Sequence, residues 1–212
     1  MRITLCNVSK SFKDHLLFEN IDYSFESGHI YGIIGCNGSG KTVLLKMMLG
    51  LSNIKDGKII VDGKVMGKDI KVIPSVGAIV NKPIFFNELT SFENLKLLAN
   101  INNKITDQDI YNALELVGLS TDSKQKIKTY SLGMNQRLGI AQAIMENPDV
   151  LILDEPTNAL DNQGIEQVHR ILKEEKAKGK LIIITSHHAY DIESLCDKII
   201  TIGDKGNYNY EK

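Results

Sequence analysis

The feature that most constrains this chain is a glycine-rich segment at positions 35–42, GCNGSGKT, which matches the pattern G-x-x-x-x-G-K-[ST]. An apolar run at 30–34 precedes it and predicts a buried strand, and apolar residues at helical spacing follow it over 42–49. Glycines allow successive backbone N–H groups to turn toward phosphate oxygens, and a helix N-terminus adds partial positive charge. A plain glycine-rich turn would match the same letters, but the strand-loop-helix context favours a phosphate-binding loop.

Within such a loop, Lys41 can reach the β- and γ-phosphates of a nucleotide, and the Thr42 hydroxyl can bind Mg²⁺. The segment therefore predicts a nucleotide site with Mg²⁺ as its metal. The residues expected to contact the nucleotide are Gly35, Cys36, Asn37, Gly38, Ser39, Gly40, Lys41 and Thr42.

Two adjacent carboxylates, Asp154 and Glu155, follow the apolar run 150–153. Ligands of open α/β sheets bind at the carboxyl ends of the strands, so this pair is placed for chemistry on the same nucleotide. We expect Asp154 to hold Mg²⁺, through water, and Glu155 to orient the attacking water or accept its proton. Because adjacent residues of an extended segment point in opposite directions, the two carboxylates can serve different tasks. Taken alone, an Asp-Glu pair would more often be a simple turn at the end of a strand.

Apolar runs and helical patterns alternate along the chain, which is typical of an α/β fold with a mixed, largely parallel sheet. Further core strands are expected at 150–153 and 181–184, with an amphipathic helix between them, and 198–202 is the last core strand expected. An N-terminal antiparallel β piece is expected as well, with strands near 3–8, 21–25 and 58–61.

The middle of the chain reads differently, because its pattern is helical over 91–118 and again over 132–145. Thr106 and Asp109 resemble a capping box at a helix start. We therefore predict one domain, 1–212, in which residues 1–84 and 147–212 form the nucleotide-binding core. A helical subdomain is predicted to interrupt that core at 85–146.

Composition narrows the function further. Lys and Arg number 25 against 26 Asp and Glu, so the chain lacks the basic excess of a dedicated nucleic-acid-binding protein. Its apolar runs are far shorter than the roughly 20 residues that a membrane-spanning helix requires, and the N-terminus has no signal-peptide pattern. If the protein serves a membrane process, we expect it to do so by docking onto another chain.

Five further segments resemble motifs of the ABC ATPase family. The segment 130–137, YSLGMNQR, resembles the family signature, 158–161 resembles the D-loop, and Ser186-His187 resembles the switch-histidine loop. Phe12 stands where the family carries an aromatic residue that stacks on adenine, although it could instead be an ordinary strand aromatic. Asn81 stands where a Gln is usual, upstream of the segment LTSFENL. With the phosphate-binding loop and the acidic pair, the resemblance covers nearly the whole chain and implies a P-loop NTPase core.

The resemblance implies an ATPase with ATP and Mg²⁺ as cofactors, in which ATP closes a dimer of two such subunits. Ser131 and Gly133 would then contact the γ-phosphate bound to the opposite subunit, and Asp161 of the D-loop would also lie at the nucleotide. The resemblance assigns catalysis to Glu155, His187, Lys41 and Asn81. It assigns the metal to Thr42, Asp154 and Asn81. As partners it implies integral membrane permease subunits, and as location the cytoplasm, peripherally at the inner face of the cell membrane.

Two departures from the family pattern bear on the function. Leu132 and Met134 replace usual signature residues, and Asn81 is one methylene shorter than Gln. The stretch 76–83 together with Ser-Leu-Gly-Met is most similar to the bacitracin-resistance and lantibiotic-immunity branch, which implies export of a peptide antibiotic or drug. A homodimer and a heterodimer remain equally open.

Two alternative functions stay open at this point. A soluble non-transport ABC ATPase, such as those of DNA repair, usually carries a coiled coil or zinc motifs before the signature, and neither heptads nor a CxxC pair occurs here. A low-turnover ATP-gated dimerisation module is suggested by Asn81 and the altered signature. Phe85 and Phe86 could belong to the core or to a groove that meets the membrane partner.

Overall fold

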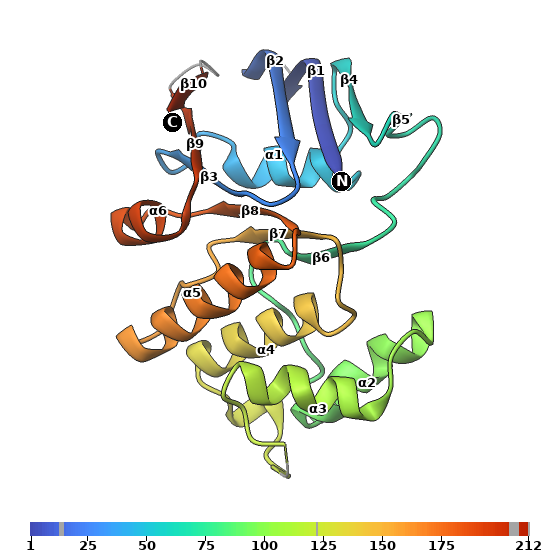
Figure 1. Cartoon of the computed structure of the whole chain (residues 1–212), viewed down its shortest axis with the longest axis vertical. Helices are drawn as coiled ribbons and strands as arrows, with labels where there is room; N and C mark the ends of the chain where they lie inside the picture. Colours follow the sequence, from blue (N-terminus) through green and yellow to red (C-terminus); the bar gives the residue numbers. More distant parts are fainter. Residues whose placement is uncertain (13–14, 122, 204–207, 212) are drawn as a thin grey trace.

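The protein, known here from a computed structural model that describes residues 1–12, 15–121, 123–203 and 208–211, contains two sheets (Figure 1). The first sheet is antiparallel and has four strands in the order β2-β1-β4-β5. This sheet confirms the expected N-terminal β piece, although its first two strands are longer than the predicted segments. Its strands are β1 (Arg2–Phe12), β2 (His15–Glu26), β4 (Asp56–Val61) and β5 (Lys64–Val65).

The second sheet forms the centre of the molecule and has six strands in the order β10-β9-β3-β8-β7-β6. Its first five strands along the chain run parallel, as predicted, and β10 pairs antiparallel with β9 at one edge. The last core strand expected from the sequence is 198–202, and β10 is an additional strand beyond it. The strands are β3 (Ile30–Gly35), β6 (Val76–Ile79), β7 (Val150–Asp154), β8 (Leu181–Thr185), β9 (Lys198–Ile202) and β10 (Tyr208–Glu211).

The central sheet is buried on both faces, which explains why its strands read as unbroken apolar runs. Along β7, Val150 and Ile152 join one hydrophobic cluster, whereas Leu151 and Leu153 join the other. The first cluster also contains helix α1 (Lys41–Met48) and the inner face of the antiparallel sheet. Figure 1 shows α1 lying between the two sheets, with the remaining long helices stacked below the central sheet.

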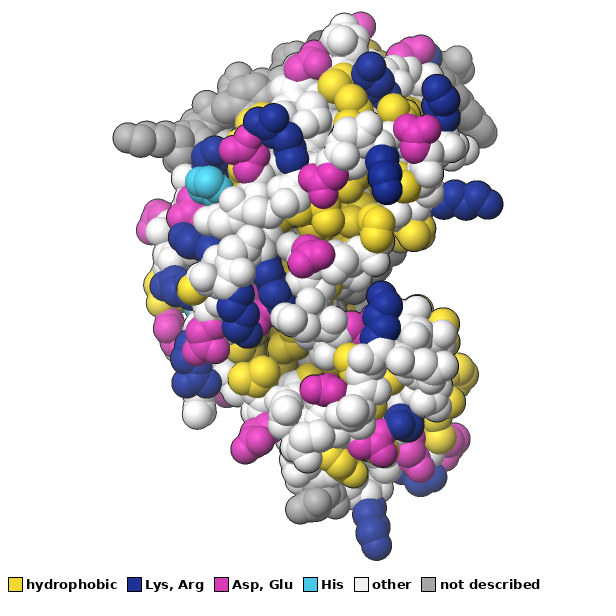
Figure 2. All heavy atoms as spheres, turned by 45° about the vertical axis from the view of Figure 1, so that its right-hand side comes forward, with side chains coloured by type: hydrophobic (Ala, Val, Ile, Leu, Met, Phe, Trp, Pro, Cys, Tyr) yellow, Lys and Arg dark blue, Asp and Glu magenta, His cyan; other side chains and the backbone are white. Residues whose placement is uncertain are grey.

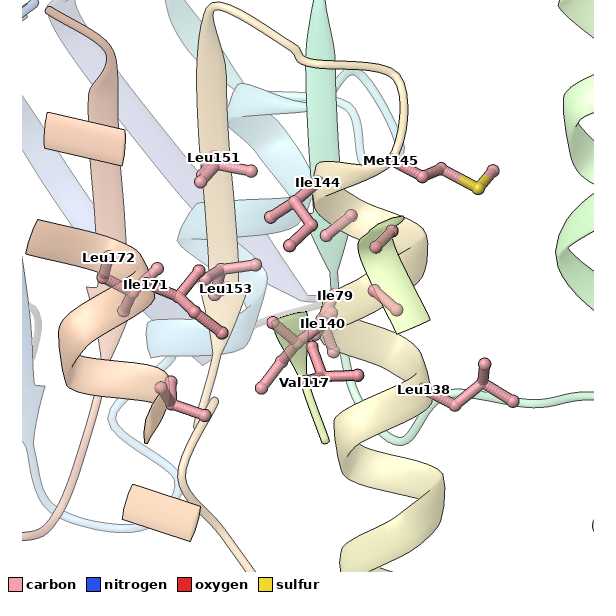
Figure 3. Packing of buried hydrophobic residues seen from close by; sticks show 14 of the residues in the cluster. Ile79, Val117, Leu138, Ile140, Ile144, Met145, Leu151, Leu153, Ile171 and Leu172 are labelled. Carbon is pink, nitrogen blue, oxygen red and sulfur yellow. The ribbon is translucent and has the colours of Figure 1, made fainter. Parts of the chain in front are cut away.

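The helical segment joins the other face of the sheet without a break in the core. Apolar residues of the helices and of β6, β7 and α5 form one cluster, shown in Figure 3. At Gly77 of β6 an added Cβ would lie 1.8 Å from the Ala143 carbonyl oxygen. Glycine at this position therefore lets β6 pack directly against the backbone of the helix that carries Ala143. The helices are α2 (Ser91–Asn102), α3 (Asp107–Leu116), a 3₁₀ turn (Ile127–Thr129), α4 (Leu132–Ile144), α5 (Asn162–Ala177) and α6 (Ala189–Leu195).

Local sequence explains where two of these helices begin. Thr106 and Asp109 form the predicted capping box of α3, each side chain accepting a backbone N–H of the other residue. Thr90 and Glu93 form a second capping box, at the start of α2, which is not among the expectations from the sequence. Figure 2 shows a hollow between the body that carries the two sheets and the lower body built from α2 and α3. No helix in the described ranges is long and apolar enough to cross a bilayer.

A buried ion pair fastens α5 to the start of β8. Lys180 and Glu175, which are 7% and 6% exposed, contact each other, and the Lys180 ammonium also donates to Asn147 Oδ1 at 2.7 Å. Burial by itself would raise the pKa of the Glu175 carboxyl, but hydrogen bonds from Lys178 and Lys180 outweigh it and lower that pKa. The carboxylate is therefore held in its charged form.

We predict that Lys180→Met lowers the free energy of unfolding by about 3 kcal/mol, because Glu175 then stays buried without its buried partner. The control is Lys173→Met, at an exposed position of α5, which should change the free energy of unfolding by less than about 0.5 kcal/mol. Urea unfolding measures both.

The pH dependence of the same pair follows from the lowered pKa. A carboxyl whose pKa is lower in the folded state stabilises the fold above its unfolded pKa, which is 4.5 here, and loses that effect as the pH falls through the folded pKa. The difference between wild type and Lys180→Met should therefore shrink below about pH 4.5. Equal stability of the two proteins at pH 7 would contradict this account of the pair.

Candidate nucleotide-binding site

The glycine-rich loop runs from the end of β3 to the start of α1, as the sequence predicts. Gly40 has φ 99°, and an added Cβ would lie 2.5 Å from the Phe18 ring, so only glycine fits at this position. Gly40 is also the N-cap of α1, and no side chain caps this helix. By contrast, the other described helices of eight or more residues are all capped by a side chain, from Thr90, Thr106, Ser131 and Asp161.

The N–H groups at the start of α1 are thus left for a ligand, which is the arrangement of an anion-binding helix terminus. The Ser39 hydroxyl supports the same conclusion, because among the described residues it is the buried side-chain oxygen without a hydrogen-bond partner. The Lys41 side chain is 8% exposed and donates from Nζ to the carbonyl oxygens of Gly35 at 2.7 Å and Cys36 at 3.2 Å. Loop, lysine and free hydroxyl together fit the phosphates of a nucleotide.

Asp154 ends β7 and is the best-connected carboxylate of this site. Its Oδ2 accepts the Thr42 hydroxyl at 2.7 Å and the Asn81 N–H at 3.3 Å, and its Oδ1 accepts the Thr185 hydroxyl at 2.6 Å. The three residues predicted to bind the metal, Thr42, Asn81 and Asp154, therefore lie together. Their hydroxyl, amide and carboxylate oxygens are the ligand types that Mg²⁺ prefers.

Asp154 and Glu155 were expected to point in opposite directions as neighbours in one extended segment, and this expectation was wrong, because Glu155 does not continue the strand. Its φ is 51°, in the left-handed region, and its N–H donates to the Thr185 hydroxyl at 2.9 Å and to the Thr185 carbonyl at 3.2 Å. This turn brings the Glu155 carboxylate to His187, whose Nδ1 lies 2.7 Å from Oε2. The two side chains are 23% and 49% exposed, so this contact lies open to solvent.

A cavity of about 430 Å³ joins the loop to the acidic pair. Phe12 lies at this cavity and is 50% exposed, with the Lys10 ammonium 4.7 Å from its ring centroid. The cavity is therefore bounded by an aromatic surface at one side and by phosphate-binding groups and carboxylates at the other. Its lining residues include Phe12, Asn37, Gly38, Gly40, Lys41, Thr42, Asp154 and Glu155.

Ser131, Gly133 and Asp161 line a second cavity, of about 710 Å³, which shares no residue with the first. Ser131 caps α4 by accepting the Met134 N–H at 3.1 Å, and Asp161 caps α5 by accepting the Gly164 N–H at 2.9 Å. The single chain therefore does not bring these three predicted nucleotide contacts to the phosphate-binding loop.

Two residues with clear contacts to the site were not singled out from the sequence. Gln136 of α4 donates to the carbonyl oxygens of Glu155 at 3.1 Å and Pro156 at 3.0 Å, and so links the signature segment to the acidic turn. Thr185 contacts both Asp154 and Glu155. The sequence held a signal for both residues. Gln136 lies within the segment that resembles the family signature, and Thr185 directly follows a predicted strand, at the same carboxyl end of the sheet as Asp154.

A third group, the buried carboxylate of Asp191 in α6, had no sequence signal. It accepts the Thr157 hydroxyl at 2.6 Å, the Ser186 hydroxyl at 2.7 Å and lies 2.7 Å from His169 Nε2. Burial by itself would raise the pKa of Asp191, but the hydrogen bonds from His169, Thr157 and Ser186 outweigh it and lower that pKa.

Comparison with known proteins places this geometry in a family. A family model described as ABC transporter matches residues 18–158. The ABC transporter ATP-binding protein YybJ of Bacillus subtilis (strain 168) is 47% identical over 92% of this chain and 89% of its own length. The bacitracin transport ATP-binding protein BcrA of Enterococcus faecalis is 40% identical, and the chain spans 63% of its length. The lantibiotic transport ATP-binding protein SrtF of Streptococcus pyogenes is 34% identical, with 83% of its length covered.

Solved structures agree on the fold. The ATP-binding subunit of an ABC transporter superimposes with a TM-score of 0.86 at 23% identity, over 99% of this chain and 90% of that one. A dimeric bacterial ABC transporter cassette superimposes with a TM-score of 0.87 at 21% identity, over 99% of both chains. The chain therefore belongs to the ABC transporter family and is an ATP-binding subunit of that family, an ATPase.

Proposed function

We propose that this ATPase drives export through separate membrane permease subunits, and that two such subunits close around ATP to do so. The observation that carries the proposal is the division of the site between two separate cavities. Lys41 and Glu155 lie at one cavity and Ser131 at the other, so a single chain offers the bound phosphates only part of the predicted contacts. A second subunit supplies the missing contacts from its own signature segment and D-loop, as a homodimer or as a heterodimer.

Each described group has a defined task in this proposal. The uncapped start of α1 and Lys41 hold the phosphates, and Phe12 stacks on the adenine ring. Thr42, Asp154 and Asn81 would hold Mg²⁺, which supplies charge neutralisation at the phosphate oxygens when it is bound. Phosphoryl transfer of this kind depends mostly on positioning and charge stabilisation.

Glu155 and His187 form the catalytic pair of the proposal. Glu155 orients the attacking water or accepts its proton, and its left-handed turn holds the carboxylate free of the strand. The 2.7 Å contact from His187 Nδ1 fixes the direction of that carboxylate. On the second cavity, Ser131 and Gly133 contact the γ-phosphate of the partner's nucleotide, and Asp161 lies at the same interface.

The proposed partners are integral membrane permeases, and the proposed location is the cytoplasmic face of the cell membrane. Relatives named for bacitracin and lantibiotic transport support export of a peptide antibiotic as the cargo class. Phe85 packs against the core, whereas Ile84 and Phe86, exposed by 91% and 67%, lie on the surface just after Asn81. These two apolar side chains support docking of a permease beside the nucleotide site.

A low-turnover, ATP-gated dimerisation module is the second candidate, and one observation favours it. Asn81 reaches Asp154 with its backbone N–H, while the side chain is one methylene shorter than the usual Gln. If the side-chain amide does not reach the metal or the water, hydrolysis would be slow and the ATP-bound dimer would stay closed for longer.

The first test of the proposal is Glu155→Gln, which removes the carboxylate and keeps its shape. We expect kcat for ATP hydrolysis to fall by about a hundredfold or more, because the general base is lost. ATP binding should remain, and the ATP-saturated variant should form a dimer in light scattering coupled to size exclusion.

The matched control carries Ser131→Arg in addition to Glu155→Gln. Ser131 lies outside the first cavity, so this double variant should bind ATP equally well and stay a monomer. Wild-type turnover in Glu155→Gln would contradict the role of Glu155, and a strictly monomeric Glu155→Gln at saturating Mg-ATP would contradict the two-subunit site.

The second test addresses Asn81. If its amide oxygen binds the metal, Asn81→Ala should lower kcat by about tenfold and raise the Mg²⁺ concentration needed for half-maximal activity. Asn81→Gln should retain more activity than Asn81→Ala. The neighbouring exposed residue offers the control Lys82→Ala, which should behave as wild type. An unchanged Mg²⁺ requirement in Asn81→Ala would exclude the residue from the metal site.

A further inference from the structure

The Asp191 carboxylate gathers donors from three different elements in the interior. It is 1% exposed, and its three partners are almost as deeply buried: Thr157 and His169 at 2% each, and Ser186 at 1%. Thr157 belongs to the connection after β7, His169 to the middle of α5, and Ser186 to the segment after β8. Because a buried carboxylate is costly unless fully hydrogen-bonded, these contacts fix the three elements relative to one another.

Two of the donors stand directly beside the proposed catalytic pair. Thr157 is two residues beyond Glu155, and Ser186 immediately precedes His187. The Ser186 hydroxyl, which donates to Asp191, also accepts the His188 N–H at 3.0 Å. The backbone is therefore held on both sides of His187.

Thr185 already joins the same two segments, because its hydroxyl contacts Asp154 and the Glu155 N–H. Asp191 joins them a second time, through Thr157 and Ser186. Glu155 therefore lies between the tied residues Asp154 and Thr157, and His187 directly follows the tied residues Thr185 and Ser186. The 2.7 Å contact of Glu155 with His187 is made by side chains that are themselves partly exposed. An exposed contact of this kind gains its geometry from the segments that carry it, since surface ion pairs by themselves are weak.

The His169 contact extends the arrangement to α5. His169 lies five residues, or about one and a half helical turns, beyond Gly164, whose N–H is capped by Asp161. The His169 ring also stacks on Tyr190 at 5.3 Å and lies 3.2 Å from the Ser194 hydroxyl, so α5 and α6 are held together here.

We infer that Asp191 is a positioning residue for hydrolysis, which sets the distance between Glu155 and His187 by holding Thr157 and Ser186 on one carboxylate. It acts through these residues and touches no nucleotide. The inference rests on the proposed roles of Glu155 and His187 and adds to them a residue from outside the nucleotide cavity.

The principal test is Asp191→Asn, which keeps the shape but changes an all-acceptor group into one that also donates. We expect kcat to fall by about tenfold to a hundredfold, because small displacements of catalytic groups have effects of that size. The Kd for ATP, measured with a fluorescent analogue, should change by less than about threefold, since the phosphate-binding loop is untouched.

Thr157 offers a milder pair of variants in case Asp191→Asn does not fold. Thr157→Val is isosteric and removes the hydrogen bond to Asp191, and it should lower kcat in the same direction. Thr157→Ser keeps the hydroxyl and should restore most of the activity. Equal kcat in Thr157→Val and Thr157→Ser would overturn the inference, because a packing role alone would not distinguish these two side chains by hydrogen bonding.

The matched control is Asp197→Asn. This carboxylate is also tied to the fold, accepting the Ile30 N–H at 2.8 Å and the Lys176 ammonium at 2.6 Å. It lies at the amino ends of the parallel strands β3 and β9, whereas Asp154 lies at the carboxyl end of β7. A general loss of stability would affect both variants, whereas a loss of kcat at constant Kd should occur in Asp191→Asn only.

A double-mutant cycle with His187→Ala separates this inference from the proposed function. In single-turnover hydrolysis, Asp191→Asn should cause little further loss once His187 is absent, because the distance that it sets no longer matters. An equal fold-loss with and without His187 would overturn the role of Asp191 while leaving that of His187 intact. If His187→Ala itself hydrolyses ATP at the wild-type rate, the proposed catalytic pair fails and the inference fails with it.

Discussion

The nucleotide site depends above all on the Asp154 carboxylate at the end of β7. It is buried, and its two oxygens accept hydrogen bonds from the start of α1 through Thr42, from the end of β8 through Thr185, and from the loop after β6 through Asn81. A buried carboxylate must be satisfied or it destabilises the fold, so this requirement brings four separate segments to one point. Those segments carry the groups that the chemistry of a bound nucleotide needs.

A second constraint is the unequal treatment of the helix N-termini. In α2, α3, α4 and α5 a side chain satisfies the free N–H groups, whereas the N-terminus of α1 has none. This difference leaves the N-terminus of α1 free for the phosphate contacts that we propose. Ser131 and Asp161 are helix caps and also line the second cavity. Fold stability and the proposed nucleotide recognition therefore rely on the same kind of hydrogen bond at different helices.

Much of this arrangement could be predicted from local sequence. The glycine-rich loop, the apolar strand before Asp154 and the capping box at Thr106 each depend on neighbours within a few residues, and each was placed correctly. The turn at Glu155, with its left-handed φ, could not be predicted, because it is held by the hydrogen bonds that the Glu155 N–H donates to Thr185, a residue of another strand. The edge strand β10 could not be predicted for a similar reason, since it is defined by its antiparallel pairing with β9.

Residue types at short fixed spacings were enough to predict the family, the α/β order of elements and the position of the glycine-rich loop between a strand and a helix. Only the tertiary structure decided that Ser131 faces a cavity separate from Lys41, and that Asp191 joins the segments of Glu155 and His187. Such contacts join residues distant in the chain, and no local pattern specifies them. They arise because buried polar groups must find partners wherever the packed core brings them.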